Sequence, residues 1–114
     1  MPILVAVRDL LFRSRIQAAA ERLAAQVRFA PRGVPLAEAA RELGGGTLLA
    51  DLSEPGVLEQ VREVKRSPGF RVIGFLGHLE VDLARSATDA GVDEVLSRGQ
   101  LVQRLDAILG AAPA

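Results

Sequence analysis

The feature that most constrains the fold of this chain is a regular alternation of short apolar runs with longer amphipathic segments. Largely apolar runs of strand length occur at 3–7 (ILVAV), 47–52 (TLLADL) and 70–76 (FRVIGFL), and less apolar ones at 26–30 and 93–97. Each run is followed by a segment in which apolar residues recur at helical spacing, as Val57, Val61 and Val64 do within 55–66. The sequence therefore predicts five consecutive strand–helix units.

Alternating strands and helices favour a parallel sheet whose two faces are covered by helices. Right-handed crossovers leave few topologies for such a chain, and the flavodoxin-like strand order 2-1-3-4-5 is the leading choice for five strands. We therefore expect an α/β fold, a three-layer sandwich formed by one domain over residues 1–110. The last residues, 111–114, are expected to form a frayed tail.

Composition excludes several classes of function. The chain has no cysteine, which excludes disulfides, thiolate metal sites and cysteine nucleophiles, and which fits a reducing compartment. Its charges balance at 14 basic and 14 acidic residues, and it contains neither Tyr nor Trp, so it lacks the basic field and the stacking residues of nucleic-acid-binding proteins. No apolar stretch is long enough for a signal peptide or a membrane span, and we expect a cytoplasmic protein.

Charged residues lie at the carboxyl ends of the first and third predicted strands. In the order 2-1-3-4-5, ligands bind where the carboxyl ends of these two strands meet, and this places Arg8, Asp9 and Asp51 together. Two carboxylates there could hold Mg²⁺, which would let an aspartate accept a phosphoryl group. Alternatively, Asp9 caps the following helix, and Asp51 accepts hydrogen bonds from loop amides or pairs with Arg8. The spacing alone leaves both interpretations open.

The motifs LLADLSEPG at 48–56 and AGVDEVLSRG at 90–99, with the acidic end of the first strand, resemble those of the receiver domain of bacterial two-component response regulators. The resemblance covers essentially the whole chain. Receivers commonly carry two acids after the first strand, a phosphoacceptor Asp after the third, Ser or Thr after the fourth and Lys after the fifth. The resemblance implies that Asp51 is the phosphoacceptor and that Asp9 is the second acid.

The sequence departs from the receiver pattern at five positions, one of which is Gly99 in place of the usual proline. Arg8 stands in place of the first acid, Leu76 in place of the hydroxyl residue, and Arg98 in place of the lysine; Val95 falls where many receivers have an aromatic residue. A fixed cation beside Asp51 should weaken Mg²⁺ binding by Asp9 and Asp51 and favour an Arg–Asp pair. Besides Asp51, the predicted pocket consists of Arg8, Asp9, Ser53, Leu76, Gly77 and Arg98.

These departures predict a degenerate receiver that is not an enzyme and has no catalytic residue. We expect a stand-alone signalling module that needs no cofactor, except weakly bound Mg²⁺, and acts by contact with a protein such as a histidine kinase or an output protein. Homodimers would form through the face made by segments 80–90, 93–97 and 100–109. The alternatives are a response regulator phosphorylated on Asp51, and a small-anion or nucleotide-binding domain that uses Arg8, Asp9, Asp51 and Arg98.

Overall fold

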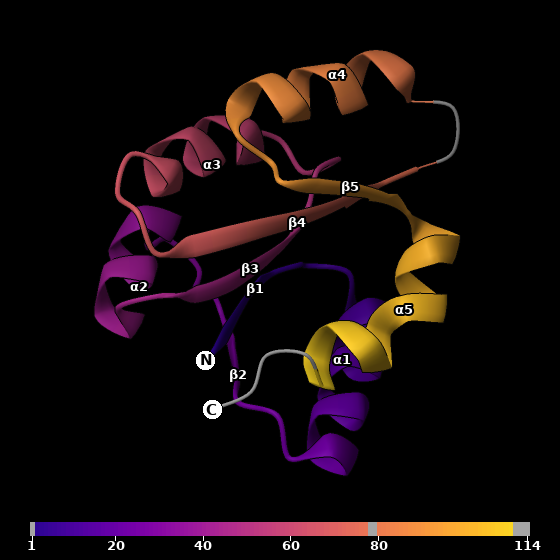
Figure 1. Ribbon diagram of the computed structural model, residues 1–114. Coiled ribbons are helices and arrows are strands. Elements are labelled where there is room, and N and C mark those ends of the chain that lie inside the picture. Colours follow the sequence, from indigo (N-terminus) through magenta and orange to yellow (C-terminus); the bar gives the residue numbers. More distant parts are fainter. Residues whose placement is uncertain (1, 78–79, 111–114) are drawn as a thin grey trace.

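The computed structural model describes residues 2–77 and 80–110 and contains one parallel sheet in the order β2-β1-β3-β4-β5 (Figure 1). The predicted fold class and strand order are therefore confirmed. The tail predicted at 111–114 lies outside the described residues. The elements are β1 Ile3–Ala6, α1 Leu10–Leu23, β2 Val27–Phe29, α2 Leu36–Leu43, β3 Gly46–Asp51, α3 Val57–Lys65, β4 Phe70–Leu76, α4 Val81–Ala90, β5 Glu94–Ser97 and α5 Arg98–Gly110.

The sheet is covered on both faces, by α1 and α5 on one side and by α2, α3 and α4 on the other (Figure 1). Successive residues of a strand point to opposite faces, so a strand covered on both sides must be apolar throughout. In β3, Leu48 packs into the core under α2 and α3, whereas Leu49 packs into the core under α1 and α5. In β4, Leu76 and Phe75 divide between the two cores in the same way.

The ends of the helices follow from local sequence. Gly44 and Gly91 adopt left-handed backbone conformations that end α2 and α4. The last helix, α5, begins at Arg98, two residues earlier than the segment predicted at 100–109. Its start is fixed by a reciprocal pair of hydrogen bonds, because Gln100 N donates to Ser97 Oγ at 3.1 Å and Ser97 N donates to Gln100 Oε1 at 2.9 Å.

Close packing at the start of β3 requires a glycine. Gly46 is buried with φ of 142°, and a Cβ atom there would lie 2.1 Å from the carbonyl oxygen of Pro2. This close approach lets β3 pair with β1 at the centre of the sheet. Asp51 then lies at the other, carboxyl end of β3. Within residues 2–77 and 80–110, no helix has both the length and the apolar character that crossing a membrane requires.

Candidate functional site

Asp51 lies at the carboxyl end of the central strand β3, in register with Phe75 of β4. It is only 5% exposed and is the one buried charged side chain among the described residues. Its Oδ1 atom accepts a hydrogen bond from Ser53 N at 3.0 Å, and its carbonyl oxygen accepts one from Glu54 N at 3.3 Å. The β3–α3 loop therefore turns back over Asp51, as the alternative of a carboxylate bonded to loop amides predicts.

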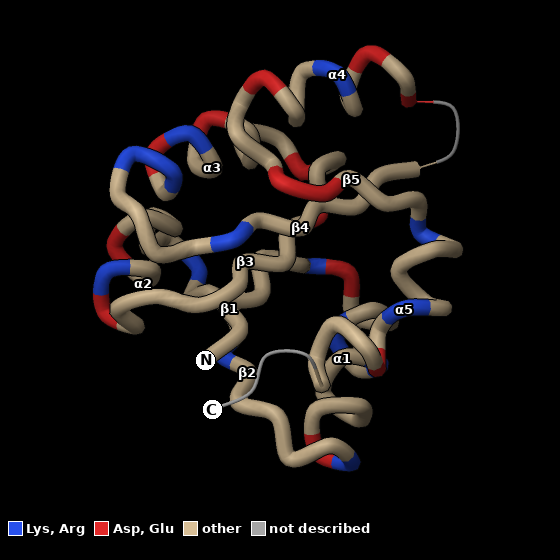
Figure 2. Tube along the Cα trace, viewed as in Figure 1, with Lys and Arg blue, Asp and Glu red and all other residues tan. Residues whose placement is uncertain are grey.

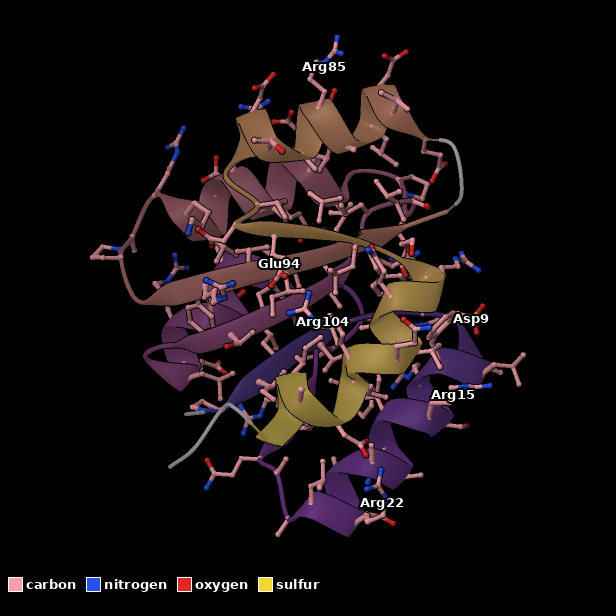
Figure 3. The ribbon with its side chains drawn as sticks, turned by 45° about the vertical axis from the view of Figure 1, so that its right-hand side comes forward. Asp9, Arg15, Arg22, Arg85, Glu94 and Arg104 are labelled. Atoms are coloured by element: carbon pink, nitrogen blue, oxygen red, sulfur yellow. The ribbon has the colours of Figure 1, made fainter. Side chains whose placement is uncertain are left out.

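Asp9 caps α1. Its Oδ1 atom accepts hydrogen bonds from Leu11 N at 2.9 Å and from Phe12 N at 3.1 Å, which satisfies two of the free N–H groups at the helix start. The labelled side chain in Figure 3 lies at this end of α1. The predicted capping role is confirmed. In the part of the chain that the structure describes, no group of three or more acidic or histidine side chains is arranged to hold a metal ion.

Arg8 pairs with Glu54 and not with Asp51. The backbone N of Arg8 donates to Glu54 Oε2 at 2.8 Å, and its Nε lies 3.7 Å from Glu54 Oε1. The arginine side chain is 71% exposed whereas Asp51 is buried, so pairing with Glu54 leaves the guanidinium in water. The predicted Arg8–Asp51 pair was therefore wrong: within 2–77 and 80–110, Asp51 has no cation within 4.0 Å.

Arg98 is also engaged away from Asp51. Its guanidinium carbon lies 5.6 Å from the centroid of the Phe12 ring, a cation–π arrangement on α1. Arg8 thus contacts Glu54, Asp9 contacts the α1 amides and Arg98 contacts the Phe12 ring. Among the described residues, none of these three side chains forms a hydrogen bond or an ion pair with Asp51. The alternative of an anion pocket built from these residues stays a prediction.

A second carboxylate, which sequence analysis missed, lies beside the Asp51 loop. Glu80, just before α4, accepts hydrogen bonds on Oε2 from Gly77 N at 2.7 Å and from Ser53 Oγ at 3.3 Å. Ser53 thus links the two acids, since its N–H binds Asp51 and its hydroxyl binds Glu80. The only sequence signal for this contact is the three-residue spacing from Gly77 to Glu80, at which a carboxylate next to a helix start often reaches back to an amide.

No family model matches the sequence, and no curated protein matches it. Solved structures do match. A response regulator signal receiver domain from Bermanella marisrubri has a TM-score of 0.73 at 20% identity over 94% of this chain and 96% of that one. A two-component response regulator from Aurantimonas has a TM-score of 0.72 at 23% identity over 99% and 86%. The chain has the receiver fold.

A third similar structure is a response regulator from Burkholderia pseudomallei with a phosphorylated aspartic acid, a calcium ion and citrate, at a TM-score of 0.70 and 22% identity over 95% of this chain and 65% of that one.

In the receiver fold, Leu76 ends β4 next to Asp51, where the motif comparison expects a hydroxyl residue. Its side chain is buried in the core shared by α2, α3 and α4. The position serves packing in this chain.

The start of β5 is acidic (Figure 2), and the two acids there, Asp93 and Glu94, have lowered pKa values. Partial burial opposes ionisation of Asp93, but hydrogen bonds from Val72 N and the Lys65 ammonium lower its pKa below the ordinary value. A hydrogen bond from Arg104, supported by Arg71, lowers the pKa of Glu94. Figure 3 shows Glu94 and Arg104 pointing toward each other from β5 and α5. These pairs anchor the edge strand.

Proposed function

We propose that this protein is a receiver-like signalling module that acts by protein contact and whose Asp51 is phosphorylated poorly or not at all. The observation that carries the proposal is the contact of Glu80 with Gly77 N and Ser53 Oγ. An N–H and a hydroxyl beside a phosphoacceptor are the donors that would stabilise the oxygens of an incoming phosphoryl group. Here an internal carboxylate already accepts hydrogen bonds from both donors.

Electrostatics supports the same proposal. A phosphoryl group brings about 1.5 to 2 negative charges, which a bound divalent cation normally offsets. Asp9 has its carboxylate committed to α1, and Arg8 occupies the place of the other acid, so Mg²⁺ would have few free ligands. The phosphoryl group would also enter next to Glu54, which lies in the loop after Asp51, and next to Glu80, which contacts Ser53 of that loop. Repulsion between these charges opposes the transfer.

Contact with partners would involve the face formed by α4, β5 and α5. The helices α4 and α5 carry the exposed apolar side chains of Val81 and Val102, and the ion pairs of Glu94 tie the edge strand β5 to β4 and α5. We propose a cytoplasmic signalling protein, such as a histidine kinase or an output protein, as the partner, and a second copy of the chain as the other candidate. Sedimentation of the wild type and of Val102→Glu tests self-association, which the introduced charge should abolish.

Incubation with acetyl phosphate and Mg²⁺, read by intact mass, tests the phosphorylation proposal. The expected result is no stoichiometric phosphoryl adduct on the wild-type chain. A stoichiometric adduct that Asp51→Asn abolishes would overturn the proposal and support the alternative of a working response regulator. The similar B. pseudomallei structure, which carries a phosphorylated aspartic acid, is the observation that keeps this alternative in view.

A pair of variants tests whether the Glu80 contact limits phosphorylation. Glu80→Gln removes the charge that faces Gly77 N and Ser53 Oγ, so it should increase any trace of adduct severalfold. Glu38→Gln is the matched control, because Glu38 is an exposed acid in the first turn of α2. An equal response of the two variants would show that overall charge, and not the Glu80 contact, limits the reaction.

A further inference from the structure

A cavity of about 460 Å³ opens at the carboxyl edge of the sheet, between the loops that follow β1, β2 and β3. Its lining includes Arg8, Arg13, Arg32 and Glu54, and apolar side chains form much of the remaining wall. Asp51 is not part of this lining, although the cavity shares Arg8 and Glu54 with the site described above. Nothing in the proposed function assigns a role to it.

The charges of this cavity are unbalanced. Arg8 faces Glu54 at 3.7 Å, whereas Arg13 and Arg32 have no acidic partner within 4.0 Å in the described part of the chain. Three arginines against one glutamate leave two positive charges in excess at the cavity wall. Side chains of like charge repel in a concave site, so an anion bound between them would lower the electrostatic energy of this arrangement.

Arg13 is held in place. It is half-buried on α1, and its guanidinium carbon lies 4.7 Å from the centroid of the Phe29 ring at the end of β2. This stacking restricts the rotamers of Arg13 before any ligand binds, so less side-chain entropy is lost on binding. A guanidinium fixed on an aromatic ring presents its planar fork of donors at the cavity, and this fork matches phosphate oxygens.

We propose that the cavity binds a phosphate monoester with a small organic body. The phosphate would accept hydrogen bonds from Arg13 and Arg32, and the organic part would pack against the apolar wall that includes Pro31 and Val57. Two observations select this class. A phosphate monoester carries about 1.5 to 2 negative charges at neutral pH, which matches the excess of two cations. A volume of about 460 Å³ lies within the usual range for small-molecule sites.

Thermal unfolding of the full chain in the presence of defined probes tests the proposal. The probes are AMP, ribose 5-phosphate and phenyl phosphate, each compared at matched ionic strength with adenosine, ribose or phenol. At ten times its dissociation constant, a ligand that binds only the folded state should raise the melting temperature by about 5 °C. At least one phosphate monoester should give this increase, and its phosphate-free counterpart should not.

Variants locate the site. Arg13→Gln and Arg32→Gln should each abolish most of the increase, whereas Arg85→Gln on α4 should retain it (Figure 3). Glu54→Gln removes the only acid of the cavity wall and should tighten binding severalfold, a gain that a folding defect would not imitate. Asp51→Asn should leave the increase unchanged, which separates this proposal from any role of Asp51.

Three results would overturn the inference. The first is that none of the three phosphate monoesters raises the melting temperature. The second is that the increase persists in both Arg13→Gln and Arg32→Gln, which would place the anion elsewhere. The third is that Arg85→Gln loses the increase to the same extent, which would mean that net positive charge alone attracts the probe. Unfolding of each variant without probe establishes that its transition remains cooperative.

Discussion

Replacing Asp93 with alanine should destabilise the protein more than an exposed position would suggest. Asp93 precedes β5, and its Oδ2 atom accepts hydrogen bonds from Val72 N at 2.7 Å and from Lys65 Nζ at 2.9 Å. Val72 is fully buried in β4, and the ladder between β4 and β5 begins only one residue later, at Ile73 and Glu94. No residue of β5 pairs with Val72, so the Asp93 carboxylate supplies the acceptor for the Val72 N–H.

Two contributions make up the expected loss of unfolding free energy in Asp93→Ala. Leaving the buried Val72 N–H without an acceptor costs about 1–3 kcal/mol of unfolding free energy. The ion pair with Lys65 adds at most about 1 kcal/mol, because its side chains are 28% and 36% exposed and water screens the attraction. We expect Asp93→Ala to cost about 2 kcal/mol. Asp93→Asn, which keeps an acceptor oxygen, should cost about 1 kcal/mol.

The pH dependence has a defined sign. The pKa of Asp93 in the folded protein lies below its ordinary value of 3.8, so the unfolded chain binds this proton more readily. The stabilisation is complete above the unfolded pKa and is lost as the pH falls through the folded pKa. The stability difference between wild type and Asp93→Asn should therefore be full at pH 7 and should shrink below about pH 4.

Urea unfolding followed by circular dichroism at pH 7 and at about pH 3 measures these differences. Asp89→Asn, which changes an exposed acid on α4 in the same way, is the matched control and should alter stability by less than about 0.5 kcal/mol. The reasoning is refuted if Asp93→Ala is as stable as this control at pH 7. It is also refuted if the difference for Asp93→Asn stays constant as the pH falls.

Three further predictions concern packing and capping, and each is measured by urea unfolding. Gly46→Ala should lose its cooperative transition, because the added Cβ would lie 2.1 Å from the Pro2 carbonyl oxygen at an unfavourable φ. Leu101→Ala should cost about 2–5 kcal/mol, whereas Val102→Ala on the exposed side of α5 should cost less than about 1 kcal/mol. Ser97→Ala removes the reciprocal cap of α5 and should cost about 1 kcal/mol.

The fold was predictable because the spacing of apolar residues within each helix or strand indicates which of its faces are buried. The valines at 57, 61 and 64 recur at helical spacing, and all three are buried. Strand runs without polar interruption, such as ILVA in β1, predict burial on both faces, and every residue of β1 is buried. The start of α5 was misplaced by two residues, although Ser97 and Gln100 form a local capping pattern that the sequence displays.

The site was predictable only in part, because its contacts join loops that are distant in the sequence. The carboxyl end of β3 and the cap at Asp9 follow from strand and helix boundaries, which are local. The choice of Glu54 as the partner of Arg8 depends on how the β3–α3 loop closes over β1, across 46 residues of sequence. A long, exposed arginine has several acids within reach, and spacing alone does not rank them.

The departures from the receiver pattern are coupled to one another through these contacts. Arg8, in place of an acid, has Glu54 as its partner, and the donors beside Asp51 have Glu80 as theirs. Returning Arg8 alone to an acid would set it against Glu54 without freeing the N–H of Gly77. Since neighbouring changes in one network are not additive, a single change such as Glu80→Gln should raise any trace of phosphoryl adduct but leave it far from stoichiometric. Reactivity should require Arg8 and Glu80 to change together, with a hydroxyl restored at Leu76.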